Sequence, residues 1–159
     1  MELEIVDDSL EPNPTLSYSI KIRGDIVTIY INGLIHLWFE RSNIDFIKAE
    51  QSSYSWWEIE FTLKSGNIII ATYDNFPKFK AITEKLRKLI RDVVIIDKDG
   101  IFHLYFEKNN IDFIKTSQNN LTVWEIFFYL KTNKKILSTY KEFKIFESVI
   151  HQVNLISKQ

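Results

Sequence analysis

Two short stretches, His36-Leu-Trp-Phe-Glu40 and Asn43-Ile-Asp-Phe-Ile-Lys48, recur later in the chain as His103-Leu-Tyr-Phe-Glu107 and Asn110-Ile-Asp-Phe-Ile-Lys115. The offset between the copies is 67 residues (103 − 36), and it stays constant when residues 25–89 are laid on residues 92–156. A fixed internal period indicates a tandem duplication, which decides the architecture before any single element does. We therefore expect an N-terminal extension of residues 1–24, a first repeat of residues 25–91 and a second repeat of residues 92–159.

Alternating apolar and polar residues predict five strands followed by one amphipathic helix in each copy. Asn32-Gly33 and Asp99-Gly100 separate the first two strands of the copies and favour tight hairpins, because these residue types tolerate positive φ. Asn75 before Pro77 predicts the start of the first helix. The predicted apolar stripes of the two helices are Phe79, Ile82, Leu86 and Leu89 in the first copy and Phe146, Val149, Val153 and Ile156 in the second.

These patterns predict an α+β protein made by tandem duplication of a βββββα unit, in which antiparallel strands are closed by a C-terminal amphipathic helix. Only Ile90 and Arg91 separate the first helix from the second copy, so we expect a fixed mutual orientation with a pseudo-two-fold relation. The extension of residues 1–24 is acidic and is predicted to contribute one strand, with Leu16, Tyr18, Ile20 and Ile22 on one face.

Length, charge and cysteine content exclude several classes of protein. The chain has 159 residues and a net charge of −1, which excludes a strongly basic nucleic-acid binder and a highly acidic nucleic-acid mimic. The lack of cysteine excludes disulfides, thiolate metal sites and a cysteine nucleophile. Without a signal-peptide pattern or an apolar run of about 18 residues, a cytoplasmic location is predicted. A composition rich in Ile and Lys is typical of an AT-rich bacterial or phage genome.

Strands followed by one helix, with Asn43-Ile-Asp-Phe-Ile-Lys48 entering the third strand and a Lys64-Ser-Gly-Asn67 turn before the fifth, resemble the short bacterial pleckstrin-homology-like domains. The resemblance covers both copies and implies a PH-like fold for each. The duplicated strands-then-helix unit is also similar to the whirly and PUR-type binders of single-stranded nucleic acid, which have four strands per unit. That second resemblance implies single-strand binding.

A repeated row of polar and aromatic side chains alternates with apolar ones on one predicted strand of each copy: His36, Trp38 and Glu40, and then His103, Tyr105 and Glu107. At about 3.3 Å per residue, His36 and Glu40 stand about 13 Å apart, which is too far for a shared metal ion or a catalytic pair. We expect the row to pair across strands or to line the contact between copies, with a binding surface as the alternative. No metal ion or cofactor is predicted.

The copies differ on the polar face of their fourth strand, where Glu60 and Thr62 are replaced by Phe127 and Tyr129. An aromatic outward face needs a cover, because large exposed apolar patches are uncommon on monomers. That cover is predicted to be the segment 16–22 or a partner. In the first copy, Tyr54 and Trp56 next to a serine-rich loop are candidate interface anchors, whereas Trp57 is expected to point inward.

The first helix is strongly basic. It carries Lys78, Lys80, Lys85, Arg87, Lys88 and Arg91 against Glu84, a net charge of +5 (6 − 1). Such a face is commonly only solvated, but it can also attract an acidic partner, a phosphate backbone or an anionic membrane. We therefore add Lys78, Lys85 and Lys88 to the candidate partner-binding residues Tyr54, Trp56, Phe127 and Tyr129.

No catalytic pattern is present. The four glycines fall at predicted turns and cannot build a phosphate-cradling loop, and no serine lies in a nucleophile-elbow pattern. The sequence therefore predicts a protein that is not an enzyme but a cytosolic protein-binding module of the immunity-protein, inhibitor or adaptor type. Its expected partner is a protein, acidic if the basic helix steers it, and the chain is expected to be a monomer or homodimer. Single-stranded nucleic-acid binding is the alternative, and anionic lipid binding is the third.

Overall fold

The computed structural model describes residues 2–6, 18–53, 55–88, 93–119 and 122–157, which belong to two compact units, Met1–Ile90 (unit 1) and Arg91–Gln159 (unit 2). Each unit is described by itself. Within unit 1, the first four strands form one antiparallel sheet in the order β1–β2–β3–β4. Their bounds are Glu2–Val6 for β1, Tyr18–Arg23 for β2, Ile26–Ile31 for β3 and Leu34–Glu40 for β4.

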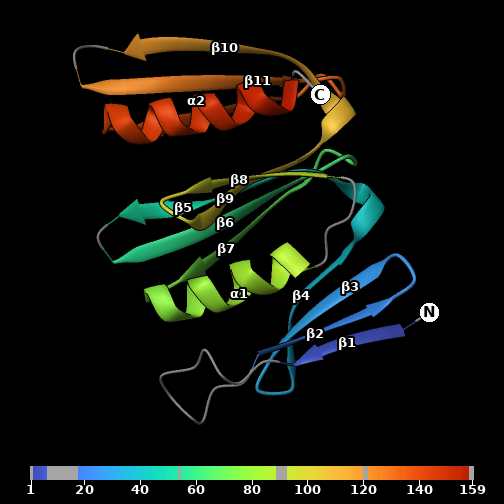
Figure 1. The fold of residues 1–159 in the computed structure, drawn as a ribbon. Helices are drawn as coiled ribbons and strands as arrows, with labels where there is room; N and C mark the ends of the chain where they lie inside the picture. The colour runs from blue at the N-terminus through green and yellow to red at the C-terminus, as the bar shows by residue number, and fades with distance from the viewer. Residues whose placement is uncertain (1, 7–17, 54, 89–92, 120–121, 158–159) are drawn as a thin grey trace. The chain divides into compact units, whose positions relative to one another are not determined.

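The rest of unit 1 consists of a short 3-10 turn, η1 (Arg41–Asn43), three further strands and a helix. Strands β5 (Ile44–Ser53), β6 (Trp56–Leu63) and β7 (Ile68–Tyr73) pair antiparallel in the order β7–β6–β5. Helix α1 (Phe76–Lys88) contacts β2, β6 and β7, so it packs against both groups of strands. Figure 1 shows α1 lying along β6 and β7.

Unit 2 begins with the antiparallel hairpin of β8 (Val93–Lys98) and β9 (Ile101–Glu107). After the 3-10 turn η2 (Lys108–Asn110), strands β10 (Ile111–Asn119), β11 (Val123–Leu130) and β12 (Lys135–Tyr140) form an antiparallel sheet in the order β10–β11–β12. Helix α2 (Phe143–Ser157) contacts β8, β11 and β12 (Figure 1). The side-chain amide of Gln152 helps to fix it, since its Nε2 donates to Asp97 O (2.8 Å) and its Oε1 accepts from Asp97 N (2.9 Å).

The predicted hairpin turns and the predicted start of the first helix are confirmed. Asn32 and Gly33 adopt φ of 52° and 80°, and Asp99 and Gly100 adopt φ of 53° and 74°, the left-handed values that a two-residue turn requires. At the start of α1, Asn75 Oδ1 accepts from Lys78 N at 3.0 Å, which satisfies a backbone donor that has no partner inside the helix. The turn and cap residues therefore determine the hairpins and the start of α1, as the sequence predicts.

The core of each unit lies between strands and helix. In β6 and β11, alternate side chains face inward: Ile59 and Phe61 in unit 1, and Ile126 and Phe128 in unit 2, all fully buried. The described part of the predicted helix stripe is buried in α1, whereas Leu89 lies outside the described residues. In α2, Val149 and Val153 are buried, and Phe146 and Ile156 are half-buried.

The predicted fold class is wrong. We expected an α+β protein built from two PH-like βββββα units, but the described chain is β-rich and its strands belong to several sheets, with α1 and α2 as the α-helices of that part. The five strands of the first copy do not form one closed sheet, because β3 and β4 join β1 and β2 while β5, β6 and β7 pair among themselves. The extension also contributes two strands, β1 and β2, rather than one. Alternation reveals which face of a strand is buried, but not which strand supplies its hydrogen bonds.

Candidate binding surface

The outer face of the β10–β11–β12 sheet carries a cluster of aromatic side chains. The rings of Phe113 and Tyr129 are stacked, with centroids 4.2 Å apart and planes inclined by 13°. Lys135 Nζ lies 4.6 Å from the ring centroid of Phe127 and 5.6 Å from that of Tyr129. Phe113 is 52% exposed, and Leu137 on β12 is also exposed. We call Phe113, Phe127, Tyr129, Lys135 and Leu137 the aromatic face.

Strand register explains why these side chains meet. Tyr129 is paired with Phe113 on β10 and with Lys135 on β12, and Phe127 is paired with Leu137. Paired residues point to the same side of a sheet, while Phe128 between them points to the core. A register shift between Ile111 and Phe113 sets the side to which Phe113 points. The aromatic face is therefore on the side opposite the buried residues of β11.

Lys115 and Ser117 border the aromatic face on β10. The register places Lys115 beside Phe127 and Ser117 beside Glu125, and Ser117 Oγ donates to Glu125 Oε1 at 3.2 Å. Among the residues that the structure describes, Lys115 has no ion-pair partner. The face thus combines the exposed ring of Phe113 and two half-buried rings with two exposed cations, Lys115 and Lys135. A surface of this kind can bind an acidic group beside an apolar one.

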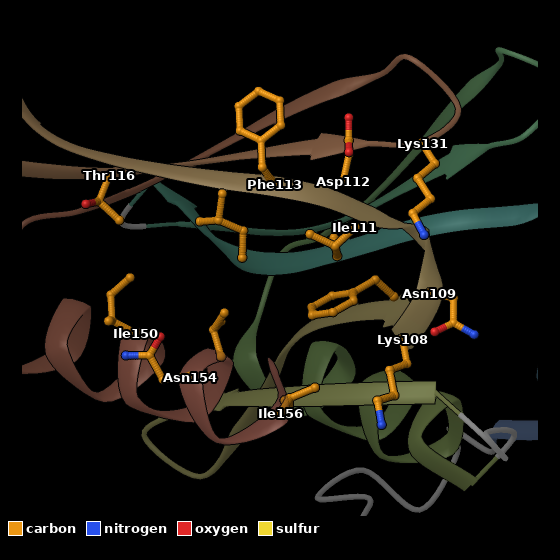
Figure 2. Close-up of a pocket in the computed structure, with 13 residues that line it drawn as sticks. Lys108, Asn109, Ile111, Asp112, Phe113, Thr116, Lys131, Ile150, Asn154 and Ile156 are labelled. Carbon is orange, nitrogen blue, oxygen red and sulfur yellow. The ribbon is translucent and has the colours of Figure 1, made fainter. Parts of the chain in front are cut away.

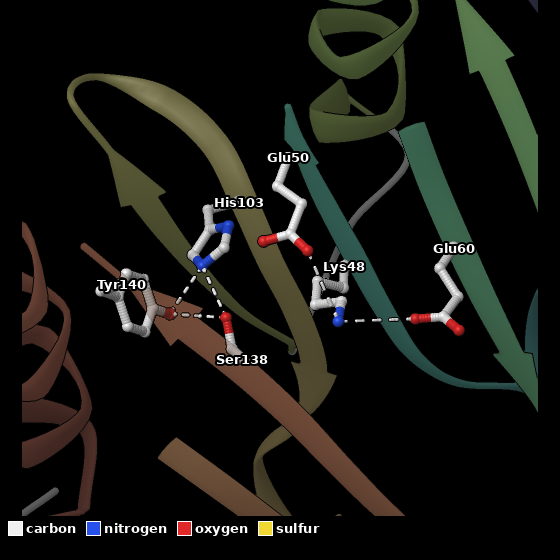
Figure 3. A network of polar contacts seen from close by, with 6 residues as sticks. All are labelled: Lys48, Glu50, Glu60, His103, Ser138 and Tyr140. Atoms are coloured by element: carbon white, nitrogen blue, oxygen red, sulfur yellow. Dashed lines mark hydrogen bonds and ion pairs between the residues drawn. The ribbon is translucent and has the colours of Figure 1, made fainter. Parts of the chain in front are cut away.

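The equivalent face of unit 1 has different chemistry. Lys48 Nζ lies 3.6 Å from Glu50 Oε1 and 3.8 Å from Glu60 Oε2, as Figure 3 shows. With the offset of 67 residues, Glu50 and Glu60 correspond to Ser117 and Phe127, so unit 2 has lost both carboxylates that neutralise the lysine in unit 1. At one of these two positions an aromatic ring, Phe127, has directly replaced a carboxylate, Glu60.

A cleft of about 680 Å³ lies between β10 and α2, on the side of the sheet opposite the aromatic face. Apolar side chains from both elements line it, among them Ile111, Ile114, Ile150 and Val153, and Lys108 and Lys131 lie at one end. Figure 2 shows Ile150 and Asn154 pointing from α2 toward β10, whereas Phe113 and Asp112 point away from the helix. The inner side of β10 is therefore incompletely covered by its own unit.

The predicted anchors of unit 1 are only partly described. Tyr54 lies outside the described residues, and Trp56 is 49% exposed. Trp57 packs inward, as expected, with its ring centroid 4.9 Å from that of Phe76 and 5.0 Å from that of Phe79. Trp56 is thus an isolated exposed ring in the described residues around it, whereas Phe127 and Tyr129 belong to a cluster.

The basic helix offers fewer free cations than the sequence predicts. Lys85 is only 2% exposed, so the expectation that it faces a partner is wrong. Lys78 Nζ is 3.0 Å from Asp74 Oδ1, and Arg87 Nε is 3.8 Å from Glu84 Oε2. Lys88 is exposed at the end of α1. Lys85 lies three residues after Ile82 and next to Leu86, within the apolar stripe, which is why the helix buries it.

The repeated polar row holds the same contact in each unit. His36 Nε2 lies 2.7 Å from Tyr73 Oη, and His103 Nε2 lies 2.7 Å from Tyr140 Oη. In unit 2, Ser138 Oγ also donates to Tyr140 Oη at 2.9 Å (Figure 3). Burial lowers the pKa of His36, and burial followed by the neighbouring Tyr18 raises the pKa of Tyr73. The histidines thus pair with a side chain of another strand, which is one of the two roles expected for this row.

The other members of the row differ in exposure. Trp38 and Glu40 on β4 are exposed, whereas Tyr105 on β9 is buried and Glu107 is half-buried. Sequence reasoning also missed Phe113, Lys115 and Lys135. Phe113 and Lys115 lie in the motif that is identical in both copies, so only the register with β11 reveals their neighbours.

Within the described residues, no three His, Asp or Glu side chains are placed to hold a metal ion. In the same part of the chain, no helix has the length and apolar character needed to cross a bilayer. No protein-family model matches the chain, and no curated protein is significantly similar to it. The candidate binding surface is therefore defined by its geometry alone.

Proposed function

We propose that the chain is a non-catalytic protein-binding module of the cytoplasm, of the immunity-protein, inhibitor or adaptor type, and that it binds an acidic protein through the aromatic face. The observation that supports this function is the stack of the exposed Phe113 on the half-buried Tyr129, bordered by Lys115 and Lys135. Large aromatic side chains are the residues that contribute most to binding energy at protein interfaces. Cations at the border steer an acidic partner toward them.

The replacement of Glu50 and Glu60 by Ser117 and Phe127 favours an acidic partner over a basic one. In unit 1 the carboxylates satisfy Lys48 within the chain. In unit 2 the corresponding Lys115 forms no ion pair within the described residues, and its register partner is the ring of Phe127. A carboxylate from a partner would therefore supply the counter-charge that unit 1 contains itself.

A graft of unit 1 chemistry onto unit 2 tests the proposal. The variant Ser117→Glu with Phe127→Glu gives Lys115 the two carboxylates that Lys48 has. Affinity capture from the native cell, with the bound proteins identified by mass spectrometry, should recover at least one acidic protein with the wild-type chain and lose it with the graft. The expected loss is at least tenfold, because a central ring is removed and like charges are introduced.

The matched control is Trp56→Ala, which removes an exposed ring from unit 1. It should leave capture unchanged. The proposal fails if the graft retains the same proteins as the wild-type chain. If instead Trp56→Ala abolishes capture while the graft does not, the binding surface lies in unit 1.

The same geometry gives a second candidate function, binding of single-stranded nucleic acid. An exposed ring stacked on a half-buried one, with adjacent cations, can receive bases and phosphates. Anisotropy of a labelled oligothymidine should then show binding at low salt that weakens steeply as salt increases, and Tyr129→Thr should reduce it. Lack of binding at about 50 mM salt would exclude this candidate.

Anionic lipid binding has less support. It would depend on the basic residues of α1, of which Lys85 is buried and Lys78 contacts Asp74. Flotation with vesicles that contain an anionic phospholipid checks it, and Lys88→Glu should matter if α1 is the contact surface.

A further inference from the structure

The cleft between β10 and α2 has the size of a site for a small molecule. Its volume is about 680 Å³, and protein pockets that bind small ligands have volumes of about 300–1,000 Å³. Every described residue that lines it belongs to unit 2, between Phe106 and Ile156, so the cleft is formed within that unit. It lies on the side of the β10–β11–β12 sheet opposite the aromatic face.

The two walls of the cleft are apolar, and the backbone explains how their side chains meet. Ile111 and Ile114 are three residues apart, a spacing that places side chains on opposite faces of a regular strand. The register shift between Ile111 and Phe113 adds the extra residue that brings both isoleucines to the α2 side. On α2, Ile150 and Val153 are about one turn apart and share the face that lines the cleft. A ligand that covers these walls removes apolar surface from water, which favours binding.

One end of the cleft is cationic. Lys108 of η2 and Lys131, the residue after β11, lie there and are exposed (Figure 2). Lys131 N donates to Asn110 O at 2.8 Å, which ties the two lysine-bearing turns together. Within the described residues, neither lysine side chain forms an ion pair. Asp112, the acid among the lining residues, points away from the helix, so it does not neutralise the lysines inside the cleft.

The distribution of charge and apolar surface indicates the class of ligand. Lysine side chains at one end provide donors for an anionic group. The isoleucine and valine side chains of the walls have no donor or acceptor, so a polypeptide backbone lying along them would lose hydrogen bonds to water without replacing them. A hydrocarbon chain has no such bonds to lose. The cleft therefore fits a molecule with an anionic head and a single apolar chain better than a segment of protein.

We propose that the cleft binds one anionic, single-chain amphiphile of the fatty-acid type. Its carboxylate or phosphate head lies at Lys108 and Lys131, and its chain lies between Ile114 of β10 and Ile150 of α2. Figure 2 shows Thr116 at the end of the cleft farthest from the lysines, where a long chain would reach solvent. This site does not rest on the proposed binding of a protein, because the cleft and the aromatic face are on opposite sides of the sheet.

Exchanging the charge of the head group and the charge of the cationic end tests the proposal. Isothermal titration calorimetry of the full chain with monomeric dodecanoate should show one site per chain. Dodecyltrimethylammonium, which has the same chain length and a cationic head, should bind about tenfold more weakly. In the variant Lys108→Glu with Lys131→Glu, dodecanoate should bind about tenfold more weakly than in the wild type, and the preference between the two amphiphiles should reverse. A reversed preference also shows that the variant is folded, since binding of the cationic amphiphile needs an intact cleft.

Dodecyl phosphate in place of dodecanoate distinguishes a phosphate head from a carboxylate head. Either order of their affinities supports the site and assigns its head group, provided that both bind more tightly than dodecyltrimethylammonium.

The matched control is Lys141→Glu with Lys144→Glu. Both lysines are exposed in unit 2 and lie outside the cleft, and their substitution changes the net charge of the chain by the same amount. This variant should bind dodecanoate like the wild type. A loss equal to that of the cleft variant would mean that the net charge of the chain attracts the amphiphile, and it would overturn the proposal.

Chain length and nuclear Overhauser contacts test the apolar walls. Affinity should increase about three- to tenfold for each two methylene groups from octanoate to dodecanoate, and by less once the chain extends past Thr116. Contacts between the dodecanoate chain and the methyl groups of Ile114 and Ile150 would place the ligand in the cleft. Contacts with the ring of Phe127 instead would place it on the aromatic face and overturn the proposal.

The proposal also fails if dodecanoate does not bind below its micelle concentration, or if the wild-type chain binds dodecyltrimethylammonium equally well. Dodecanol that binds as tightly as dodecanoate would contradict it too, because the lysines would then not select a head group. An apolar side chain of a protein segment would in that case be the better occupant of the cleft.

Discussion

The outer faces of the β5–β6–β7 and β10–β11–β12 strands began as copies and now have opposite chemistry. In unit 1, Lys48 lies between Glu50 and Glu60 and forms an ion pair with each. In unit 2, Phe113 stacks on Tyr129 and Lys135 lies over the rings. The inner faces have kept the same buried residues at Ile59 and Ile126. The buried residues have thus been retained, whereas the outward-facing residues have diverged.

The largest expected effect tests whether the inner faces are equivalent. Phe61→Ala and Phe128→Ala remove rings at matching positions, both fully buried. Each should lower the free energy of unfolding of its unit by about 3–5 kcal/mol, because a cavity replaces the ring. Guanidinium denaturation followed by fluorescence measures both. A loss below about 1 kcal/mol at either position would contradict equivalent packing.

The aromatic stack should have a smaller, measurable coupling energy. Tyr129→Thr introduces the residue that unit 1 has at this position, and Phe113→Ala removes the other ring. A double-mutant cycle on the free energy of unfolding should give a coupling of about 0.5–1.5 kcal/mol. Zero coupling would mean that the rings are neighbours without mutual stabilisation, and the contrast with unit 1 would then concern charge alone.

The lysines at the equivalent positions should respond differently to substitution. Lys48→Met breaks two ion pairs and should cost about 0.2–1 kcal/mol at low salt, with the cost decreasing as salt screens the pairs. Lys115→Met should leave the stability nearly unchanged. Thermal melts at low and high salt compare the variants. Equal, salt-dependent losses at both positions would show that unit 2 has compensated for its missing acids.

The smallest effect concerns His36. Because burial lowers its pKa in the folded chain, the unfolded chain takes up a proton first as the pH falls. The stability that neutral His36 provides is therefore fully present above its unfolded pKa of about 6.5 and is lost as the pH falls through and below that value. His36→Gln should flatten this part of the pH dependence of the free energy of unfolding. If the pH dependence of the free energy of unfolding is unchanged by His36→Gln, His36 is not the group responsible for this loss of stability.

Local features of the fold could be predicted, because they depend on neighbouring residues. Asn32-Gly33 and Asp99-Gly100 indicated their hairpins, and Asn75 indicated the start of α1. Strand pairing could not be predicted, since the edge of β3 is occupied by β2 from a segment outside the repeat. The alternation in β3 is the same whichever strand is its neighbour.

Only some residues of the aromatic face could be predicted, because the others depend on which strands are neighbours. Phe127 and Tyr129 differ from their copies, so they could be found by comparing the repeats. Phe113 is identical to Phe46, and only the surroundings make it exposed. Lys85 was counted among surface charges although its helical position lies within the apolar stripe. Counting charged residues gives the net charge of a helix, but the helical periodicity decides which of those residues face solvent.

The contact between the histidine of the first hairpin and the tyrosine of the last strand, present in both units, has a dynamic consequence. His103 is on β9 and Tyr140 is on β12, so neither the hairpin nor the three-stranded sheet of unit 2 can open while that bond is intact. Hydrogen exchange of backbone amides in the two segments should then proceed through a common opening event, with similar protection in β9 and β12. We therefore expect the hairpin and the three-stranded sheet of unit 2 to open together rather than one after the other.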